Sequence, residues 1–326
     1  MIRTHLFRKD CVVECEGSID VALQLPEGTS AWVDIEAPTD EELDLLTTRF
    51  RFHPLAVEDC VHHQKRAKIE RYQSHGFVVL TALDRTTRTD LLDTTSICIF
   101  IRPRLAVTVR SKRITAIERI QHILADEPDR VGNSTERVLH AILDAVIDEF
   151  TPLLDDWEDE LDEIEDDAAQ PGVHNLADHL VQLRRKLLLV RRIILPQIEV
   201  VRRLVDDDSP EVSAEYRVYF RDVLDHALVV SETTSLFLEV ANGAITVHAN
   251  AVNERLNEVM KFLAIVSTLL LPWTVVSGIF GMNFDVIPLS HQPLGFFAAV
   301  GVMVAVTIGL LYYFRRKGWL GRPALQ

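Results

Sequence analysis

The sequence predicts an α+β fold: an N-terminal α/β domain, a long helix and two C-terminal membrane-spanning helices. Three observations lead to this prediction. Short β-branched runs alternate with helical patterns over residues 1–130, no proline occurs in residues 211–271, and two long apolar segments follow near the C-terminus. These segments, residues 262–284 and 294–314, contain no Asp, Glu, Lys or Arg. Each is long enough for a helix to cross a bilayer.

The first domain is predicted over residues 1–210. Residues 77–83, 96–102 and 105–111 read as strands, and the last two are expected to form a hairpin around Pro103. Residues 38–50 read as a helix, because Thr39 can cap its N-terminus and acidic residues fill its first turn.

The end of this domain is predicted to be a helical hairpin with arms of opposite charge. Ten of the thirteen residues in 155–167 are Asp or Glu, Pro171-Gly172 breaks the pattern, and the following helix, residues 174–205, is rich in arginine. Charge pairs between antiparallel arms are one interpretation. The other is that the acidic arm gathers divalent cations near a pore mouth.

The long helix is predicted to begin at Glu211, to form a stalk over residues 211–261, and to continue into the first span. One amphipathic helix of this length cannot bury its own apolar stripe, so the pattern favours oligomerisation.

The distribution of charge predicts the orientation of the two spans. Lys261 precedes the first span and a basic tail, residues 315–326, follows the second, whereas the connecting loop has neither Lys nor Arg. Both termini of this multi-pass protein are therefore expected in the cytoplasm. The N-terminus lacks the apolar segment of a signal peptide.

Composition and missing motifs exclude several classes of function. The formal net charge of the 326-residue chain is −15, which is unsuited to nucleic acid. Its four cysteines follow no zinc-site spacing, so free or buried thiols are expected. The sequence contains no phosphate-binding loop, nucleophile elbow or HExxH motif, and an enzyme is not predicted.

A stripe of polar, small or thin residues follows one face of the predicted helix from the stalk into the first span. Its members recur at steps of three and four: Asn257, Met260, Ala264, Ser267, Leu271, Thr274, Gly278 and Gly281. Such a stripe in a membrane indicates close helix packing in the simplest interpretation. The alternative is that several copies surround a narrow conduit, with Asn283 at its end.

The sequence resembles the CorA magnesium-transporter family over nearly its whole length. Gly281-Met282-Asn283 closes the first span, and Pro272 precedes this motif by nine residues. Further segments resemble the family in the family's order: HPLAVEDC (53–60), RAKIERYQSHGFVVL (66–80), YFRDVLDH (219–226), NEVMK (257–261) and the basic YYFRRKGWL. The resemblance implies a homopentamer in a prokaryotic plasma (inner) membrane, with a funnel-shaped cytoplasmic domain and five stalk helices around a pore.

The resemblance also implies a selectivity filter made of Gly281, Met282 and Asn283. Because Mg²⁺ loses its water reluctantly, a filter of amide and carbonyl oxygens suits the hydrated ion.

The residues around the filter have expected roles as well. Asp285 in the loop can raise the local cation concentration, and the expected constriction lies near Met260, Leu263 and Leu271. The membrane potential supplies about 2.3 kcal/mol per charge at 100 mV, so import of Mg²⁺, Co²⁺ or Ni²⁺ needs no ATP.

By resemblance, cytosolic Mg²⁺ closes the pore by binding between neighbouring subunits, so Mg²⁺ is both regulator and cargo. The matching positions are Asp59 and Asp222, with Glu58 and Asp144 as a second site and Asp148 as a weaker candidate. Two carboxylates that face each other repel, and a divalent ion between them turns this repulsion into a bridge.

Two other functions stay open. A zinc transporter like ZntB shares the architecture, although Met282 favours magnesium because zinc-transporting relatives tend to replace it. A non-conducting, membrane-anchored sensor or scaffold is the alternative from another class, and it gives no reason for Asn283 or for the polar stripe.

Overall fold

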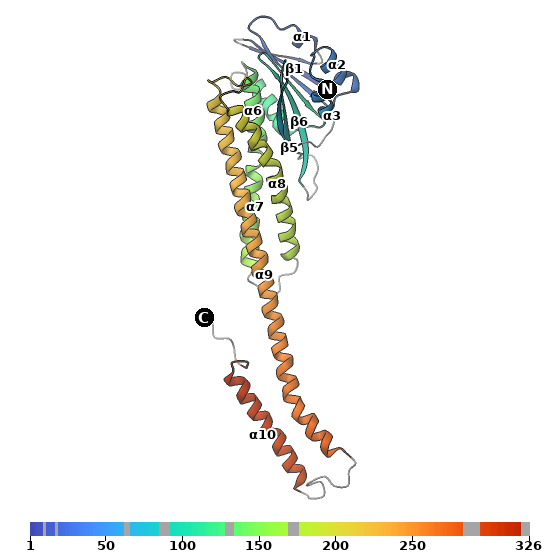
Figure 1. The fold of residues 1–326 in the computed structure, drawn as a ribbon, viewed down its shortest axis with the longest axis vertical. Helices are drawn as coiled ribbons and strands as arrows, with labels where there is room; N and C mark the ends of the chain where they lie inside the picture. The colour runs from blue at the N-terminus through green and yellow to red at the C-terminus, as the bar shows by residue number, and fades with distance from the viewer. Residues whose placement is uncertain are drawn as a thin grey trace. The chain divides into compact units, whose positions relative to one another are not determined.

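The computed structural model describes residues 1–8, 11–16, 19–61, 66–84, 92–127, 134–168, 176–282 and 294–320 (Figure 1). The chain divides into two compact units. The first comprises Met1–Asp167 and His174–Ile245, and the second comprises Ala168–Val173 and Thr246–Gln326.

A seven-stranded sheet forms the centre of the first unit, in the order β2-β1-β3-β7-β6-β5-β4. Neighbouring strands are antiparallel except β3 and β7, which are parallel. The strands are β1 (Ile2–Arg8), β2 (Cys11–Glu16), β3 (Ser30–Glu36), β4 (Lys68–Arg71), β5 (Gly76–Asp84), β6 (Asp93–Arg102) and β7 (Leu105–Arg110).

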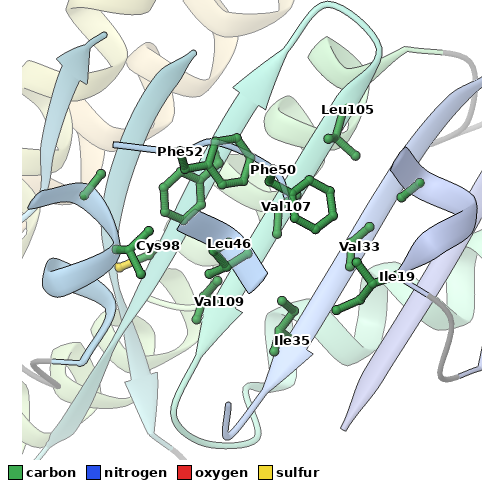
Figure 2. Close-up of a cluster of buried hydrophobic side chains, with 14 of the residues drawn as sticks. Ile19, Val33, Ile35, Leu46, Phe50, Phe52, Cys98, Leu105, Val107 and Val109 are labelled. Carbon is green, nitrogen blue, oxygen red and sulfur yellow. The ribbon is translucent and has the colours of Figure 1, made fainter. Parts of the chain in front are cut away.

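Three short helices cover one face of this sheet: α1 (Asp20–Leu23), α2 (Asp40–Thr48) and α3 (Pro54–Val61). Between them and the sheet lies an apolar core in which Phe50 and Phe52 stack at 5.6 Å between ring centroids. Figure 2 shows these rings beside side chains of alternate strand positions, including Val33 and Val107. Alternation places every second residue of a strand on the same face, which builds the core from one face of each strand.

The predicted local structures are confirmed where the sequence carries specific signals. Thr39 caps α2 and forms a capping box with Glu42, because each side chain bonds the other residue's backbone N–H. Strands β6 and β7 form the predicted hairpin, with Arg102 opposite Leu105.

Three more helices belong to the first unit: α4 (Thr115–Asp126), α6 (Thr135–Asp148) and α8 (Leu176–Val205). Helices α6 and α8 contact the sheet and α4 contacts α6, and Figure 1 shows α6 and α8 on the side of the sheet opposite α2.

A buried ionic network lies on this side of the sheet. Asp34 accepts hydrogen bonds from Arg110 at 3.0 Å, from Gln121 at 3.0 Å and from the Thr108 hydroxyl at 2.6 Å. The carboxylate is therefore buried with its charge and its acceptors satisfied.

Helices α7 (Thr151–Ala168), α8 and the first part of α9 (Arg217–Phe280) bury apolar stripes at heptad spacing. The buried positions of α9 in the first unit are Phe220, Val223, Ala227, Val230, Thr234, Phe237, Leu238, Ala241 and Ala244. Between the acidic α7 and the basic α8, Lys186 Nζ lies 3.9 Å from a carboxylate oxygen of Glu160. Apolar burial is the main attraction here, because an ion pair this long and this exposed contributes little.

The long helix begins at Arg217, six residues after the position that the sequence predicts. Glu211 instead accepts hydrogen bonds from Arg71 at 3.1 Å and from the Ser209 hydroxyl at 2.9 Å. These contacts tie the preceding segment to the edge of the sheet, so residues 211–216 form turns rather than helix.

The second unit contains the remainder of α9 and helix α10 (Gly295–Arg316). Both helices are long and apolar enough to cross a membrane, and most of their apolar segments lie exposed. The Trp273 indole N–H donates to the Thr307 hydroxyl at 2.8 Å and links the two helices. Asn283, Asp285 and the last six residues of the basic tail lie outside the described residues.

Candidate functional site

Two carboxylates and an imidazole from different helices gather on the surface of the first unit. The donor atoms of Asp144, Asp148 and His226 all lie within 4.8 Å of one another. His226 Nδ1 is 3.4 Å from a carboxylate oxygen of Asp148 and 4.0 Å from one of Asp144. We call these three residues the α6–α9 cluster.

The cluster arises from the way α6 packs beside the start of α9. The ring of His140 lies 5.7 Å from that of Phe220, one turn before Asp144 meets His226. Contacts therefore advance in the same direction along both helices, which are parallel here. Asp144 and Asp148 are four residues apart and share one face of α6.

Burial and mutual repulsion govern the charge of this cluster. Burial raises the pKa of Asp144, and the neighbouring Asp148 raises it further, while His140 and His226 oppose the shift. Asp222 also raises the pKa of Asp144, so the structure brings these two predicted metal residues into one electrostatic group. Burial lowers the pKa of His140, which stays uncharged more readily despite Asp144 and Asp222.

This arrangement has the chemistry of a divalent-cation site. Carboxylate oxygens are the ligands that Mg²⁺ prefers, whereas imidazole nitrogen suits Co²⁺, Ni²⁺ and Zn²⁺. The side chains of Asp144, Asp148 and His226 are 36%, 44% and 49% exposed, so an ion can reach them from solvent. A bound ion would remove the repulsion between the two carboxylates.

The other predicted metal residues, Glu58 and Asp59, lie on α3 and are not members of this cluster. Asp59 forms an ion pair of 2.6 Å with Lys68, and Lys68 also binds Glu70 at 2.7 Å. Burial lowers the pKa of Lys68, but its hydrogen bonds to Asp59 and Glu70 outweigh burial and raise it. A cation at Asp59 must therefore compete with this ammonium group.

His226 is the residue that the sequence analysis missed. The signal was present, because His226 follows Asp222 by four residues in the segment YFRDVLDH and so lies one turn away on the same helix. Only the packing of α6 beside α9 shows that it meets Asp144 and Asp148.

The residues of the predicted stripe lie on α9 in the second unit, except Gly281, which follows the helix in a turn. All of them are exposed in the single chain, and Met260 and Leu271 are 65% and 62% exposed. Leu263 of the predicted constriction is also exposed. The Thr274 hydroxyl donates to the Leu271 carbonyl at 2.8 Å, which leaves its lone pairs free to accept.

The turn at Gly281 is closely packed against its own backbone. A Cβ atom at this position would lie 3.0 Å from the Ser277 carbonyl oxygen, so a larger residue would require a small shift of this turn. Gly281 N–H donates to that same carbonyl at 2.9 Å. A glycine therefore fits the way the helix ends without displacing its own backbone.

Comparisons with known proteins agree with this architecture. A family model described as CorA-like Mg²⁺ transporter protein matches residues 27–316. YfjQ of Bacillus subtilis (strain 168) is 34% identical over 297 residues, which cover 91% of this chain and 92% of that protein. The cobalt/magnesium transport protein CorA of Thermotoga maritima is 26% identical over 306 residues, which cover 92% of this chain and 87% of that protein.

Solved structures share the fold. The complete CorA magnesium transporter of Methanocaldococcus jannaschii superimposes with a TM-score of 0.85 at 23% identity, covering 98% of this chain and 99% of that one. The cytoplasmic domain of ZntB from Vibrio parahaemolyticus is more distant, with a TM-score of 0.65 at 16% identity over 78% of this chain and 99% of that one. The matched family model and the Bacillus relative extend over most of the sequence, and the chain belongs to the CorA-like Mg²⁺ transporter family.

Proposed function

We propose that the protein is a Mg²⁺ channel that imports the ion down the membrane potential and closes when cytosolic Mg²⁺ binds between subunits. Membership of the family supports divalent-cation transport. We also propose that the channel carries Co²⁺ and Ni²⁺ and that it is a homopentamer. It would lie in a prokaryotic plasma membrane with both termini in the cytoplasm. The charge distribution around the two spans supports this orientation.

One observation carries the proposal of a shared pore. Helix α9 buries a heptad stripe up to Ala244 and then, over its remaining length, exposes nearly every large side chain, from Val247 to Phe280. An isolated helix with this surface would be unstable in water and would lack a partner in lipid. Copies of α9 around a common axis would cover one face of the helix, while lipid and α10 would cover the other.

In this assembly the stripe from Asn257 to Gly281 would face the axis. The hydroxyls of Ser267 and Thr274 would offer acceptors to a hydrated cation, while Met260, Leu263 and Leu271 would form apolar constrictions. Asn283 would supply a ring of amide oxygens at the filter, and Asp285 would concentrate cations beside it. Mg²⁺ would pass with much of its water, because dehydration is costly.

Closure would depend on metal bound to the cytosolic domain. The α6–α9 cluster offers Asp144, Asp148 and His226, and Asp222 lies close enough to influence Asp144. We propose that Asp59 and Glu58 of a neighbouring subunit complete this ligand set. The ion pair between Asp59 and Lys68 would then open as the cation binds, so Lys68 sets the cation concentration at which the pore closes.

The zinc alternative has one observation in its favour. His226 is a ligand type that Zn²⁺ accepts more readily than Mg²⁺ does, and the ZntB domain has the same fold. Met282 argues for magnesium. A non-conducting scaffold gives no reason for an exposed stripe of hydroxyls and glycines inside a span.

Ion flux into proteoliposomes separates these functions. Mg²⁺ and Zn²⁺ are tested separately under an inside-negative potential, with Mg²⁺ on the cytoplasmic-domain side raised in a second series. A gated channel gives Mg²⁺ uptake that falls as the Mg²⁺ concentration on the side of the cytoplasmic domain is raised. Zn²⁺ uptake that tracks a proton gradient supports the zinc transporter, and no flux of either ion supports the scaffold.

A further inference from the structure

A cavity of about 530 Å³ lies between α8 and strands β5 and β6 of the first unit. No member of the α6–α9 cluster lines it, and neither does Asp59 or Asp222. The volume falls within the range of about 300–1,000 Å³ that is usual for small-molecule sites.

The polar lining of this cavity is strongly biased in charge. Its lining residues include Arg66 and Arg192 and the hydroxyl-bearing Thr81, Thr94, Thr95 and Ser96, and none of its lining residues carries a carboxylate. In a chain with a formal net charge of −15, this is a local reversal of sign. A cavity lined by cations and hydroxyl donors attracts anions.

The two arginines are available to a ligand. Neither Arg66 nor Arg192 forms an ion pair with a residue that the structure describes. Asp84, at the end of β5, does not cancel their charge, because it pairs with Lys112 at 3.0 Å. Arginine suits this role since its planar fork matches the oxygens of a phosphate group.

The hydroxyls and the apolar wall complete the cavity. Thr95 and Ser96 are only 2% and 7% exposed, so their side chains are fixed in place by the sheet. Thr95 also bonds the Ser111 hydroxyl at 3.2 Å. On the opposite side, Ile193 and Pro196 of α8 supply an apolar surface.

We propose that this cavity binds a small phosphate-bearing anion, with Arg66 and Arg192 on the phosphate oxygens. Thr95 of β6 offers a hydroxyl for a further hydrogen bond, and the apolar wall of α8 contacts the organic part of a larger ligand. Binding is direct rather than metal-mediated, because the cavity has no carboxylate to hold a cation.

Isothermal titration calorimetry on the full chain in detergent tests this site, with pyrophosphate and ATP as separate probes and EDTA present throughout. The test variants are Arg192→Ala and Arg66→Ala. Arg191→Ala is the matched control, since Arg191 is the exposed neighbour on α8 and does not line the cavity. Loss of a charge-assisted contact is expected to weaken binding of either probe about tenfold in both test variants and leave the control unchanged.

Three outcomes would overturn the proposal. One is that neither probe binds the wild-type chain. Another is equal weakening in Arg191→Ala, which would assign binding to the general charge of α8. The third is binding that occurs only when Mg²⁺ replaces EDTA. Binding of pyrophosphate alone would support a site for the phosphate group, and tighter binding of ATP would show that the apolar wall takes part.

Discussion

The indole N–H of Trp273 donates to the hydroxyl of Thr307 at 2.8 Å, and this hydrogen bond joins the two apolar helices of the second unit. Thr307 in turn donates to the Met303 carbonyl of its own helix at 2.8 Å. The threonine hydroxyl is thus oriented by α10 to accept from α9. In lipid such a bond has no competing water, and it favours this packing of the two helices.

Replacing Trp273 by Phe is expected to lower the free energy of unfolding by about 0.6–2 kcal/mol, because the donor is lost while the aromatic ring remains. Thr307→Val should have a similar effect, and the double variant should lose no more than either single one. Denaturation of the detergent-solubilised chain measures this coupling. Trp319→Phe is the matched control, and additive losses at positions 273 and 307 would contradict the account.

The α6–α9 cluster should make thermal stability depend on divalent cations. At a hundred times its Kd a bound cation stabilises the folded chain by about 2.7 kcal/mol. Asp148→Asn and His226→Ala are expected to abolish most of this gain for Co²⁺. Asp225→Asn, an exposed neighbour on α9 outside the cluster, should retain it. An unchanged Co²⁺ response in the two cluster variants would show that the ion binds elsewhere.

Without metal, the same cluster should make the chain less stable as pH rises. Burial and Asp148 raise the pKa of Asp144 above its unfolded value, so the folded chain holds this proton more tightly. Its contribution is therefore favourable at low pH and is lost as pH rises through the raised pKa. In EDTA, Asp144→Asn should remove this loss. Thermal unfolding across pH measures this loss of stability. Identical curves for the wild type and Asp144→Asn would refute the prediction.

His75 should have the opposite effect on stability: protonating it at acid pH should make the folded chain less stable. Burial lowers its pKa to about 4, with Arg102 and His53 as further causes, and its ring packs 4.9 Å from that of Phe52. The unfolded chain takes up this proton near pH 6.5, so stability is present above that pH and falls progressively down to about pH 4. His75→Phe should flatten the acid limb. Unfolding between pH 7 and pH 4 tests this, and an unchanged slope would contradict it.

A side chain at Gly76 should destabilise the folded chain, in contrast with a side chain at a glycine in the long helix. A Cβ atom at Gly76 would lie 2.9 Å from Cγ of Glu211, which holds the segment before α9 against Arg71. Gly76→Ala is expected to cost about 1–3 kcal/mol. Gly243→Ala meets nothing within 4 Å and should stabilise α9 by roughly 0.5–1 kcal/mol. Denaturant unfolding compares the two, and effects of the same sign would refute this reading.

The sequence predicted those elements whose local signals were strong. Thr39, followed by acidic residues, predicted the start of a helix. The apolar run that ends at Arg102 and the one that begins at Leu105 predicted a hairpin. The two apolar segments predicted the helices of the second unit. The family resemblance, which rested on several segments in order, is confirmed by the family model.

What the sequence could not predict depends on contacts between distant segments. Strands β1 to β4 carry short or weakly alternating patterns, and β3 pairs in parallel with β7, about seventy residues later, which no local rule specifies. The predicted start of α9 was wrong because Glu211 forms a hydrogen bond with Arg71, which is 140 residues earlier in the sequence. His226 was missed for the same reason, since only packing brings it to Asp144.

We propose above that α9 lines a Mg²⁺ pore that ends in an asparagine filter. The measurement that tests it most directly is Mg²⁺ uptake into proteoliposomes under an inside-negative potential, for wild type, Asn283→Ala and the control Asn242→Ala, which changes an asparagine of α9 outside the span. We expect Mg²⁺ uptake by the wild type and by the control, and loss of uptake in Asn283→Ala while that variant is still folded and reconstituted. Undiminished Mg²⁺ uptake by Asn283→Ala would contradict it.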